Sequence, residues 1–294
     1  MTNPRSLGHS RPGGTEGQPP SLVPAPRWGE LAGRPHRGRR TNPPEASVDR
    51  LQELISTAER VAVFTGAGVS TLCGIPDFRS PGGIYSRVDP DRIFAVDEFR
   101  RDPSYFYTEA REFIYGLGDK QPGPVHRVCA ELERRGLCTG IITQNIDMLH
   151  QKAGARRVIE LHGSPAGHTC PGCGARTGFA EIAVVVRRGE VPRCPACGGV
   201  PKPDITFFGE MLPPGALEDA FALASEADLL LVLGSSLLVH PAAGVPVATL
   251  QAGGRIAVVN RESTPLDRHA VYRAADLARE FIALGRWLGL EEVS

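Results

Sequence analysis

The sequence predicts an α/β fold, a doubly wound parallel sheet that carries a second, smaller domain as insertions. One observation is that short apolar runs alternate with helical segments along most of the chain. Another is that these runs are continuously apolar, as in central parallel strands that helices cover on both faces. Strands that alternate with helices favour a Rossmann-like large domain, in which ligands bind at the carboxyl ends of the strands.

The ordered part of the chain is expected to begin near residue 46. Residues 1–45 contain nine prolines, seven glycines and seven arginines, with no periodic apolar pattern. Such a segment cannot bury enough surface to offset its ordering entropy, so we predict a disordered tail. A helix with Ser47 as its N-cap is then predicted, because apolar residues recur at helical spacing: Val48, Leu51, Leu54 and Ile55.

Five apolar runs are predicted as strands: Val61–Phe64, Gly140–Thr143, Val158–Leu161, Leu229–Leu233 and Arg255–Val259. Helices are expected between them, at Pro124–Arg135 and Ala216–Ala227. Two segments interrupt this alternation, one rich in Phe and Tyr and one that holds a cysteine cluster. We therefore assign residues 46–290 to one catalytic domain, with a large-domain core at 46–80, 121–164 and 204–290. The smaller domain comprises a helical insertion at 81–120 and a metal-binding module at 165–203.

Composition excludes several classes of protein. The 294 residues carry no formal net charge, so no overall field attracts nucleic acid or an acidic membrane. The hydrophobic fraction of 41% is ordinary for a globular protein, and no apolar run reaches the roughly 18 residues that span a bilayer. The charged N-terminus lacks the hydrophobic segment of a secretory signal. We therefore expect a cytoplasmic protein without membrane or direct nucleic-acid contacts.

A glycine-rich segment, Thr65–Arg79, directly follows the first predicted strand. Glycines there let a backbone approach a pyrophosphate closely, and a following helix would direct its N–H groups at the negative charge. The spacing of Gly66, Gly68 and Gly74 departs from the usual dinucleotide fingerprint, and a plain strand-to-helix turn explains it equally well. The succession Asp77-Phe78-Arg79 favours a nucleotide site, because a plain turn has no use for those three side chains.

The seven cysteines indicate metal binding rather than disulfides, since the number is odd and no secretory signal is present. Two C-x-x-C pairs, 20 residues apart, supply four thiolates for a tetrahedral structural zinc ion: Cys170, Cys173, Cys194 and Cys197. The alternative is a zinc ribbon that binds nucleic acid, but its loop lacks exposed aromatic residues among the arginines. His168 is expected to lie outside the ligand set, near the ligands or on the surface, and the other three cysteines are expected to be buried free thiols.

Polar residues follow three further predicted strands. These are Thr143-Gln-Asn-Ile-Asp147, Glu160-Leu-His-Gly163 and Gly234-Ser-Ser-Leu-Leu-Val-His-Pro241. Parallel strands present their carboxyl ends at one edge, so His162 and Asn145 are expected beside the glycine-rich segment. His126 and His150 are interpreted as packing residues.

Together, these motifs resemble the sirtuins, the NAD-dependent protein deacylases, of the bacterial type with a four-cysteine zinc site. Further matches are Lys202-Pro-Asp-Ile-Thr-Phe-Phe-Gly-Glu210 and Val259-Asn260, so the similarity covers residues 47 to 285. The resemblance implies that the acyl-lysine carbonyl oxygen attacks the NAD ribose carbon that bears nicotinamide. His162 is then the general base on a ribose hydroxyl, and Asn145 and Asp147 are its catalytic partners.

The same resemblance implies the binding residues. For NAD they are Gly66, Ala67, Gly68, Ser70, Ile75, Asp77, Phe78, Arg79, Gln144, Asn145, Ile146, Asp147, Gly234, Ser235, Ser236, Asn260 and Asp276. An acetylated peptide or protein is expected to add as a strand between Phe208–Met211 and Leu238–His240. The implied peptide-binding residues are Thr206, Phe208, Gly209, Glu210, Leu238 and Val239.

Departures from the family pattern bear on the acyl group. Relatives that remove succinyl or malonyl groups use a Tyr and an Arg where alignment on Pro103 places Ala110 and Phe113. A dicarboxyl chain would then bury an unpaired charge, so neutral acyl groups are predicted, with acetyl first. Two alternatives stay open: protein mono-ADP-ribosylation on the same scaffold, and a non-catalytic NAD-sensing or silencing module.

Overall fold

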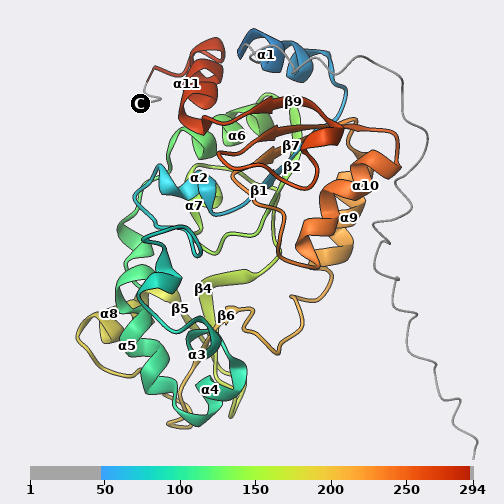
Figure 1. The fold of residues 1–294 in the computed structure, drawn as a ribbon. Helices are drawn as coiled ribbons and strands as arrows, with labels where there is room; N and C mark the ends of the chain where they lie inside the picture. The colour runs from blue at the N-terminus through green and yellow to red at the C-terminus, as the bar shows by residue number, and fades with distance from the viewer. Residues whose placement is uncertain (1–47, 292–294) are drawn as a thin grey trace, which may run out of the picture. The chain divides into compact units, whose positions relative to one another are not determined.

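The computed structural model describes residues 48–291 (Figure 1). The predicted disordered tail and the predicted N-cap Ser47 therefore lie outside the described residues. Among the described residues, no helix has the length and apolar character needed to cross a membrane.

A six-stranded parallel sheet forms the larger part of the fold. Its strands are β1 (Val61–Thr65), β2 (Cys138–Thr143), β3 (Val158–Glu160), β7 (Leu229–Leu233), β8 (Arg255–Val259) and β9 (Ala270–Ala274). Their spatial order is β3-β2-β1-β7-β8-β9, and every neighbouring pair is parallel. The chain therefore winds outward from β1 in one direction and from β7 in the other, as the doubly wound prediction requires. The strand order reverses between β1 and β7, which is where such folds bind their ligands.

Helices cover both faces of this sheet. One face carries α1 (Val48–Thr57), α6 (Pro124–Arg134) and α11 (Leu277–Trp287), whose apolar side chains pack with Val61 and Val63 of β1 in one core. On the other face, α9 (Ala216–Glu226) and α10 (Val245–Gln251) pack against each other (Figure 1). All five residues of β1 and of β7 are buried, which explains why both runs are continuously apolar.

A second, three-stranded sheet has the order β5-β4-β6 and is antiparallel. Its strands are β4 (Gly163–Thr169), β5 (Arg176–Gly178) and β6 (Lys202–Ile205). Four helices surround it in Figure 1: α3 (Pro90–Ile93), α4 (Val96–Arg101), α5 (Pro103–Phe113) and α8 (Phe179–Arg187). These elements share a separate aromatic core, built on Phe94, Phe99, Phe106, Tyr107 and Phe207.

Short elements complete the chain. They are the one-turn helices α2 (Gly68–Thr71) and α7 (Leu149–Lys152) and the 3-10 helices at Ile84–Ser86, Leu117–Asp119, Ala242–Gly244 and Asp267–His269. The five predicted strands are present with bounds within two residues, whereas β9 and the three strands of the smaller sheet, β4, β5 and β6, were not predicted. The helix expected after the glycine-rich segment is α2, a single turn. The proposed domain boundaries stay a prediction.

Candidate active site

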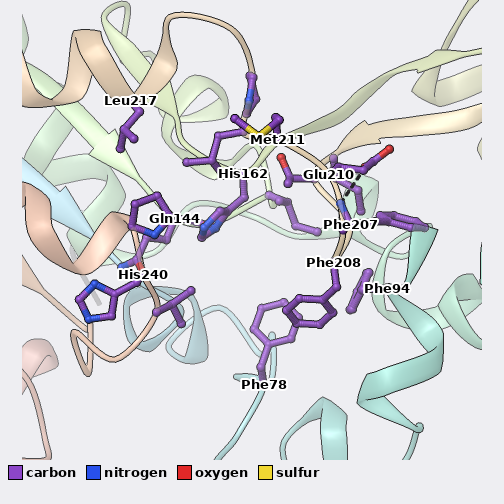
Figure 2. A pocket seen from close by; sticks show the side chains of 18 of the residues that line it. Phe78, Phe94, Gln144, His162, Phe207, Phe208, Glu210, Met211, Leu217 and His240 are labelled. Carbon is purple, nitrogen blue, oxygen red and sulfur yellow. Dashed lines mark hydrogen bonds between the residues drawn. The ribbon is translucent and has the colours of Figure 1, made fainter. Parts of the chain in front are cut away.

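A cavity of about 630 Å³ lies at the carboxyl edge of the six-stranded sheet. Ten of its lining residues belong to the sets predicted above: Phe78, Arg79, Gln144, Ile146, His162, Thr206, Phe208, Gly209, Glu210 and Val239. They come from the ends of β1, β2, β3, β6 and β7 or the loops that follow. Figure 2 shows His162 and Gln144 on one side of the cavity and Phe78 and Phe208 on another.

His162 follows β3 and reaches this cavity in a defined tautomer. Its Nδ1 lies 2.8 Å from the backbone carbonyl oxygen of Gln144. A carbonyl oxygen only accepts hydrogen bonds, so Nδ1 carries the hydrogen and Nε2 keeps its lone pair. Burial lowers the pKa of His162, and the hydrogen bond to Gln144 opposes that effect only in part. The ring is therefore a neutral base at neutral pH.

A buried polar cluster joins the loops that follow β1 and β2. The Ser70 hydroxyl donates to Asp147 Oδ2 at 2.5 Å, and Asn145 Nδ2 donates to Ser70 Oγ and to the Gly66 carbonyl oxygen, both at 3.1 Å. Asp147 Oδ1 also accepts the Leu149 N–H at 2.9 Å. All three side chains are less than 10% exposed, so these bonds replace the water that each polar group would otherwise bind.

Gln144 joins β2 to the loop after β7. Its backbone carbonyl holds His162, and its side-chain Nε2 donates to Ser235 Oγ at 2.8 Å. Ser235 Oγ also accepts the Leu237 N–H at 3.3 Å. Gln144 therefore links the histidine and the loop that carries Ser235 through two different groups, its backbone carbonyl and its side-chain amide.

The glycines after β1 permit close contact between two loops. A Cβ on Gly66 would lie 2.7 Å from the Gly234 carbonyl oxygen, and one on Gly68 would lie 2.8 Å from Gly234 Cα. Gly234 itself has φ +59°, and a Cβ there would lie 2.5 Å from the Val69 nitrogen. Glycine is therefore required at these three positions because the loop after β1 packs directly against the loop after β7.

The segment after Gly74 folds back over the cavity. Asp77 Oδ1 accepts the N–H groups of Arg79 and Ser80, which closes a turn. The Phe78 ring packs against Tyr85 and Phe94 with ring centroids 5.5 and 6.1 Å apart, so the cavity wall here is aromatic. Ile75 lies instead on a second cavity of about 540 Å³, which α5 also lines.

The predicted peptide segments flank the same cavity. Phe208 pairs through its backbone with Phe94 and Val96, and Thr206 N–H donates to the His162 carbonyl oxygen at 2.8 Å. Phe208 and Leu238 are 54% and 64% exposed, so each of the two predicted peptide segments presents one apolar side chain to solvent.

The remaining predicted nucleotide residues lie at the same sheet edge, away from the cavity lining. Ala67 precedes α2, Ser236 follows Ser235, and Asn260 follows β8 with its Nδ2 bound to the Glu262 carbonyl oxygen. Asp276 follows β9 and accepts the Arg279 N–H at 3.0 Å, so it caps α11.

The four predicted zinc ligands converge. The sulfur atoms of Cys170, Cys173, Cys194 and Cys197 all lie within 4.8 Å of one another, a separation that one tetrahedral zinc ion bridges. Gly174 and Gly198 follow the two pairs with φ +74° and +75°, the left-handed conformation that such tight turns need. The residues present therefore fit a structural zinc ion with no open coordination position.

His168 lies two residues before the ligand Cys170 and not on the surface, the other position that the sequence left open. It is fully buried, and its Nε2 lies 2.8 Å from the Tyr115 hydroxyl. His126 and His150 are also buried, as expected, and their rings pack 4.8 Å apart. Cys129 and Cys138 are buried thiols, whereas Cys73 is partly exposed.

The family model described as "Sir2 family" matches residues 66–241, which include the site just described. This match spans more than half of the chain. The chain belongs to the Sir2 family.

Curated Sir2 relatives cover most of the chain. An "NAD-dependent protein deacetylase 1" of Pyrobaculum aerophilum is 40% identical over 80% of this chain and 92% of its own length. An "NAD-dependent protein deacetylase" of Thermotoga maritima is 42% identical over 73% of this chain and 87% of its own length. An "NAD-dependent protein deacylase 2" of Archaeoglobus fulgidus is 40% identical over 76% of this chain and 88% of its own length.

Solved Sir2 structures share the fold. One with a deacetylated p53 peptide and 3'-O-acetyl ADP ribose is 38% identical, with a TM-score of 0.77 over 82% of this chain and 98% of its own. A Sir2 structure bound to a propionylated peptide is 37% identical, with a TM-score of 0.75 over 83% of this chain and 99% of its own.

Sequence reasoning missed part of the cavity wall of this Sir2 chain. The lining residues outside the predicted sets and peptide segments are Tyr85, Phe94, Ile205, Phe207, Leu212, Pro213, Pro214, Gly215, Leu217, Glu218 and Pro241, whereas Met211 and His240 belong to the predicted peptide segments. Tyr85 and Phe94 fall in the segment noted for its aromatic residues, but nothing in that pattern indicates which rings face the cavity. The loop after Glu210 lacks periodicity altogether.

Proposed function

We propose that this chain is an NAD-dependent protein-lysine deacetylase that yields nicotinamide, O-acetyl-ADP-ribose and deacetylated lysine. The observation that carries the proposal is His162, whose Nε2 is free to accept a proton at the wall of the cavity. The relatives' printed activities support the same reaction class.

His162 acts as the general base. Its Nδ1 hydrogen stays on the Gln144 carbonyl oxygen while Nε2 takes a proton from a ribose hydroxyl of the NAD co-substrate. The fixed tautomer removes the need to reorient the ring before proton transfer. Asn145, Ser70 and Asp147 form one hydrogen-bonded cluster, which holds their polar atoms in place for the nicotinamide end of NAD.

The sheet edge fits a dinucleotide because its polar side chains gather where the strand order reverses. The cluster around Asp147 lies after β2, and Ser235 and Ser236 lie after β7. We assign the nicotinamide side to Ala67, Phe78, Ile146 and Asp147, together with Ile75, which lines the second cavity in this structure, and the phosphate and adenosine side to Ser235, Ser236, Asn260 and Asp276. Phe78 would keep water from the reacting sugar.

The acyl peptide adds beside Gly209. Phe208 uses its N–H and carbonyl groups to pair with Phe94 and Val96. Among the described residues, Gly209 has no backbone hydrogen-bond partner, which leaves it ready to pair with an extended peptide. The acyl-lysine side chain then enters along Thr206 and Phe208 toward His162.

The acyl specificity follows from the aromatic wall. Phe113, at the position where an Arg is needed for dicarboxyl groups, packs its ring 6.2 Å from Phe94, which lines the cavity. Among the described residues that line it, Arg79 is the one guanidinium. A carboxylate buried beside Phe94 would lack a partner, so we assign neutral acyl groups to this enzyme.

A panel of acyl-lysine peptides with NAD, read by mass spectrometry, tests this function. Butyryl and succinyl peptides are matched controls, because both acyl groups have four carbons and differ in one carboxylate. Acetyl and butyryl loss are expected, with succinyl loss at least about 100-fold slower. Equal succinyl loss would contradict the specificity. Adenine label on protein without acetyl loss would indicate ADP-ribosylation, and NAD binding without turnover would indicate a non-catalytic module.

The domain boundaries given above, a cytoplasmic location and the lack of direct nucleic-acid contact remain part of the proposal. The two separate hydrophobic cores support a division into a larger and a smaller domain.

A further inference from the structure

A nearly buried lysine lies behind the peptide-binding segment. The side chain of Lys202, at the start of β6, is 14% exposed, and its Nζ lies 2.8 Å from Glu210 Oε2. The same ammonium donates to the carbonyl oxygens of Ile205 and Pro203, at 2.8 and 3.2 Å. It also lies 4.2 Å from the centre of the Phe207 ring. This one group therefore contacts both ends of residues 205–210.

The ion pair closes the segment on itself. Glu210 Oε2 accepts the Phe207 N–H at 2.9 Å, and the Glu210 N–H donates to the Phe207 carbonyl oxygen at 3.0 Å. The Phe207 ring is fully buried in the aromatic core, so the turn from Phe207 to Glu210 is fixed at its base. Lys202 adds a bond from this turn to β6, which β4 holds in place.

The charges explain why this arrangement needs both partners. Burial lowers the pKa of Lys202, and the Glu210 carboxylate partly restores it. Loss of either side chain would leave the other charge partly shielded from water and without its ion-pair partner. The free-energy cost of that unpaired charge exceeds the stabilisation that an exposed ion pair provides. The pair thus differs from surface pairs in the same region, such as that between Arg187 and Asp119, at 43% and 73% exposure.

We propose that Lys202 and Glu210 are positioning residues, which hold Thr206–Gly209 in the conformation that accepts the acyl-lysine peptide. Thr206 and Phe208 line the cavity between the two anchored ends, and Gly209 carries the unpaired backbone groups. Glu210 then contributes to peptide binding through the shape of this segment rather than through direct contact. The inference rests on the proposed deacetylase function and adds residues that control its peptide affinity.

Steady-state kinetics of the full chain test this inference. Lys202→Gln and Glu210→Gln are each expected to raise KM for an acetylated peptide about tenfold, the loss typical of a hydrogen bond to a charged group. KM for NAD is expected to stay within about twofold, because none of the residues assigned to NAD lies between Lys202 and Glu210. Lys202→Arg keeps the charge and is expected to restore most of the peptide affinity. The double variant is expected to lose no more than either single variant, since both remove the same ion pair.

Arg187→Gln is the matched control, because it removes an ion pair and a bond to the Tyr115 carbonyl oxygen near the same aromatic core but leaves residues 202–210 unchanged. Its peptide KM is expected to match that of the wild type. A wild-type peptide KM in both Lys202→Gln and Glu210→Gln would overturn the inference, as would an equal rise of KM for NAD. If Lys202→Gln fails to fold, Glu210→Gln, which keeps the side-chain shape, decides alone. Absence of wild-type turnover would instead contradict the proposed function.

Discussion

The imidazole of His162 shows how one backbone bond selects a chemical role. The Gln144 carbonyl oxygen fixes the hydrogen on Nδ1, and burial keeps the ring neutral. The same Gln144 bonds Ser235 through its side chain, so the base and the β7 loop share one support. Sequence motifs predicted both residues, but they did not predict this bridge, which depends on the distance between β2 and β7 in the folded sheet.

The pH dependence of kcat/KM tests the state of His162. A general base must be unprotonated, so activity is lost as the pH falls through its pKa. Because burial lowers that pKa, half of the activity should be lost below the ordinary value of about 6.5. Measurement of kcat/KM for acetylated peptide from pH 5 to 8 checks this. If half of kcat/KM were lost at a pH above about 6.5, the pKa of His162 would not be lowered by burial and the expectation would be wrong.

At the scale of elements, the four cysteines anchor the three-stranded sheet. Cys170 follows β4, and the second pair, Cys194 and Cys197, precedes β6. A zinc ion would therefore tie β4 and β6 together at one end of this antiparallel pair, and the opposite end carries both His162 and the peptide segment. Structural zinc contributes directly to folding free energy, so its removal should affect this sheet first.

Substitution of one ligand tests the zinc site. Cys173→Ser is expected to lower the zinc content from one ion per chain to well below one and to lower the melting temperature, since three thiolates hold zinc less tightly. Elemental analysis and thermal unfolding measure the two effects. Cys129→Ala is the control, because Cys129 is a buried thiol outside the cluster. Full zinc content in Cys173→Ser would contradict the assignment.

Fully buried strands were easier to predict from the sequence than partly buried ones. Leu229–Leu233 matches its prediction because a fully buried strand is continuously apolar. The strand Ala270–Ala274 was missed because it lies at the edge of the sheet, is only partly buried and contains Arg273. The cavity wall at Leu212–Gly215 was missed because a loop without periodicity is placed by tertiary contacts alone. The four cysteines were predictable from spacing, since metal geometry constrains the sequence locally.

Considered as a whole, the molecule keeps several histidines buried and neutral. Burial lowers the pKa of His126 and of His168 to about 4, and it lowers that of His150 well below the usual value. An unfolded chain binds protons at these groups near pH 6.5, whereas the folded chain resists them until about pH 4. Their contribution to stability is therefore present above about pH 6.5 and is lost as the pH falls toward 4.

Urea unfolding at pH 7 and pH 5 tests this acid sensitivity. When the pH falls from 7 to 5, the lowered pKa of His126 and that of His168 are each expected to reduce the free energy of unfolding by about 2 kcal/mol. The variant His168→Gln should show a smaller difference between the two pH values than the wild type. An identical difference in both proteins would show that His168 does not contribute to the acid sensitivity.

The most direct test of the central claim is the NAD-dependent loss of acetyl groups from a peptide by wild type and by His162→Gln. The wild type is expected to release one deacetylated peptide per NAD consumed. The variant is expected to be at least about 100-fold slower, with an unchanged melting temperature. Deacetylation by the variant at the wild-type rate, or by the wild type without NAD, would contradict the account.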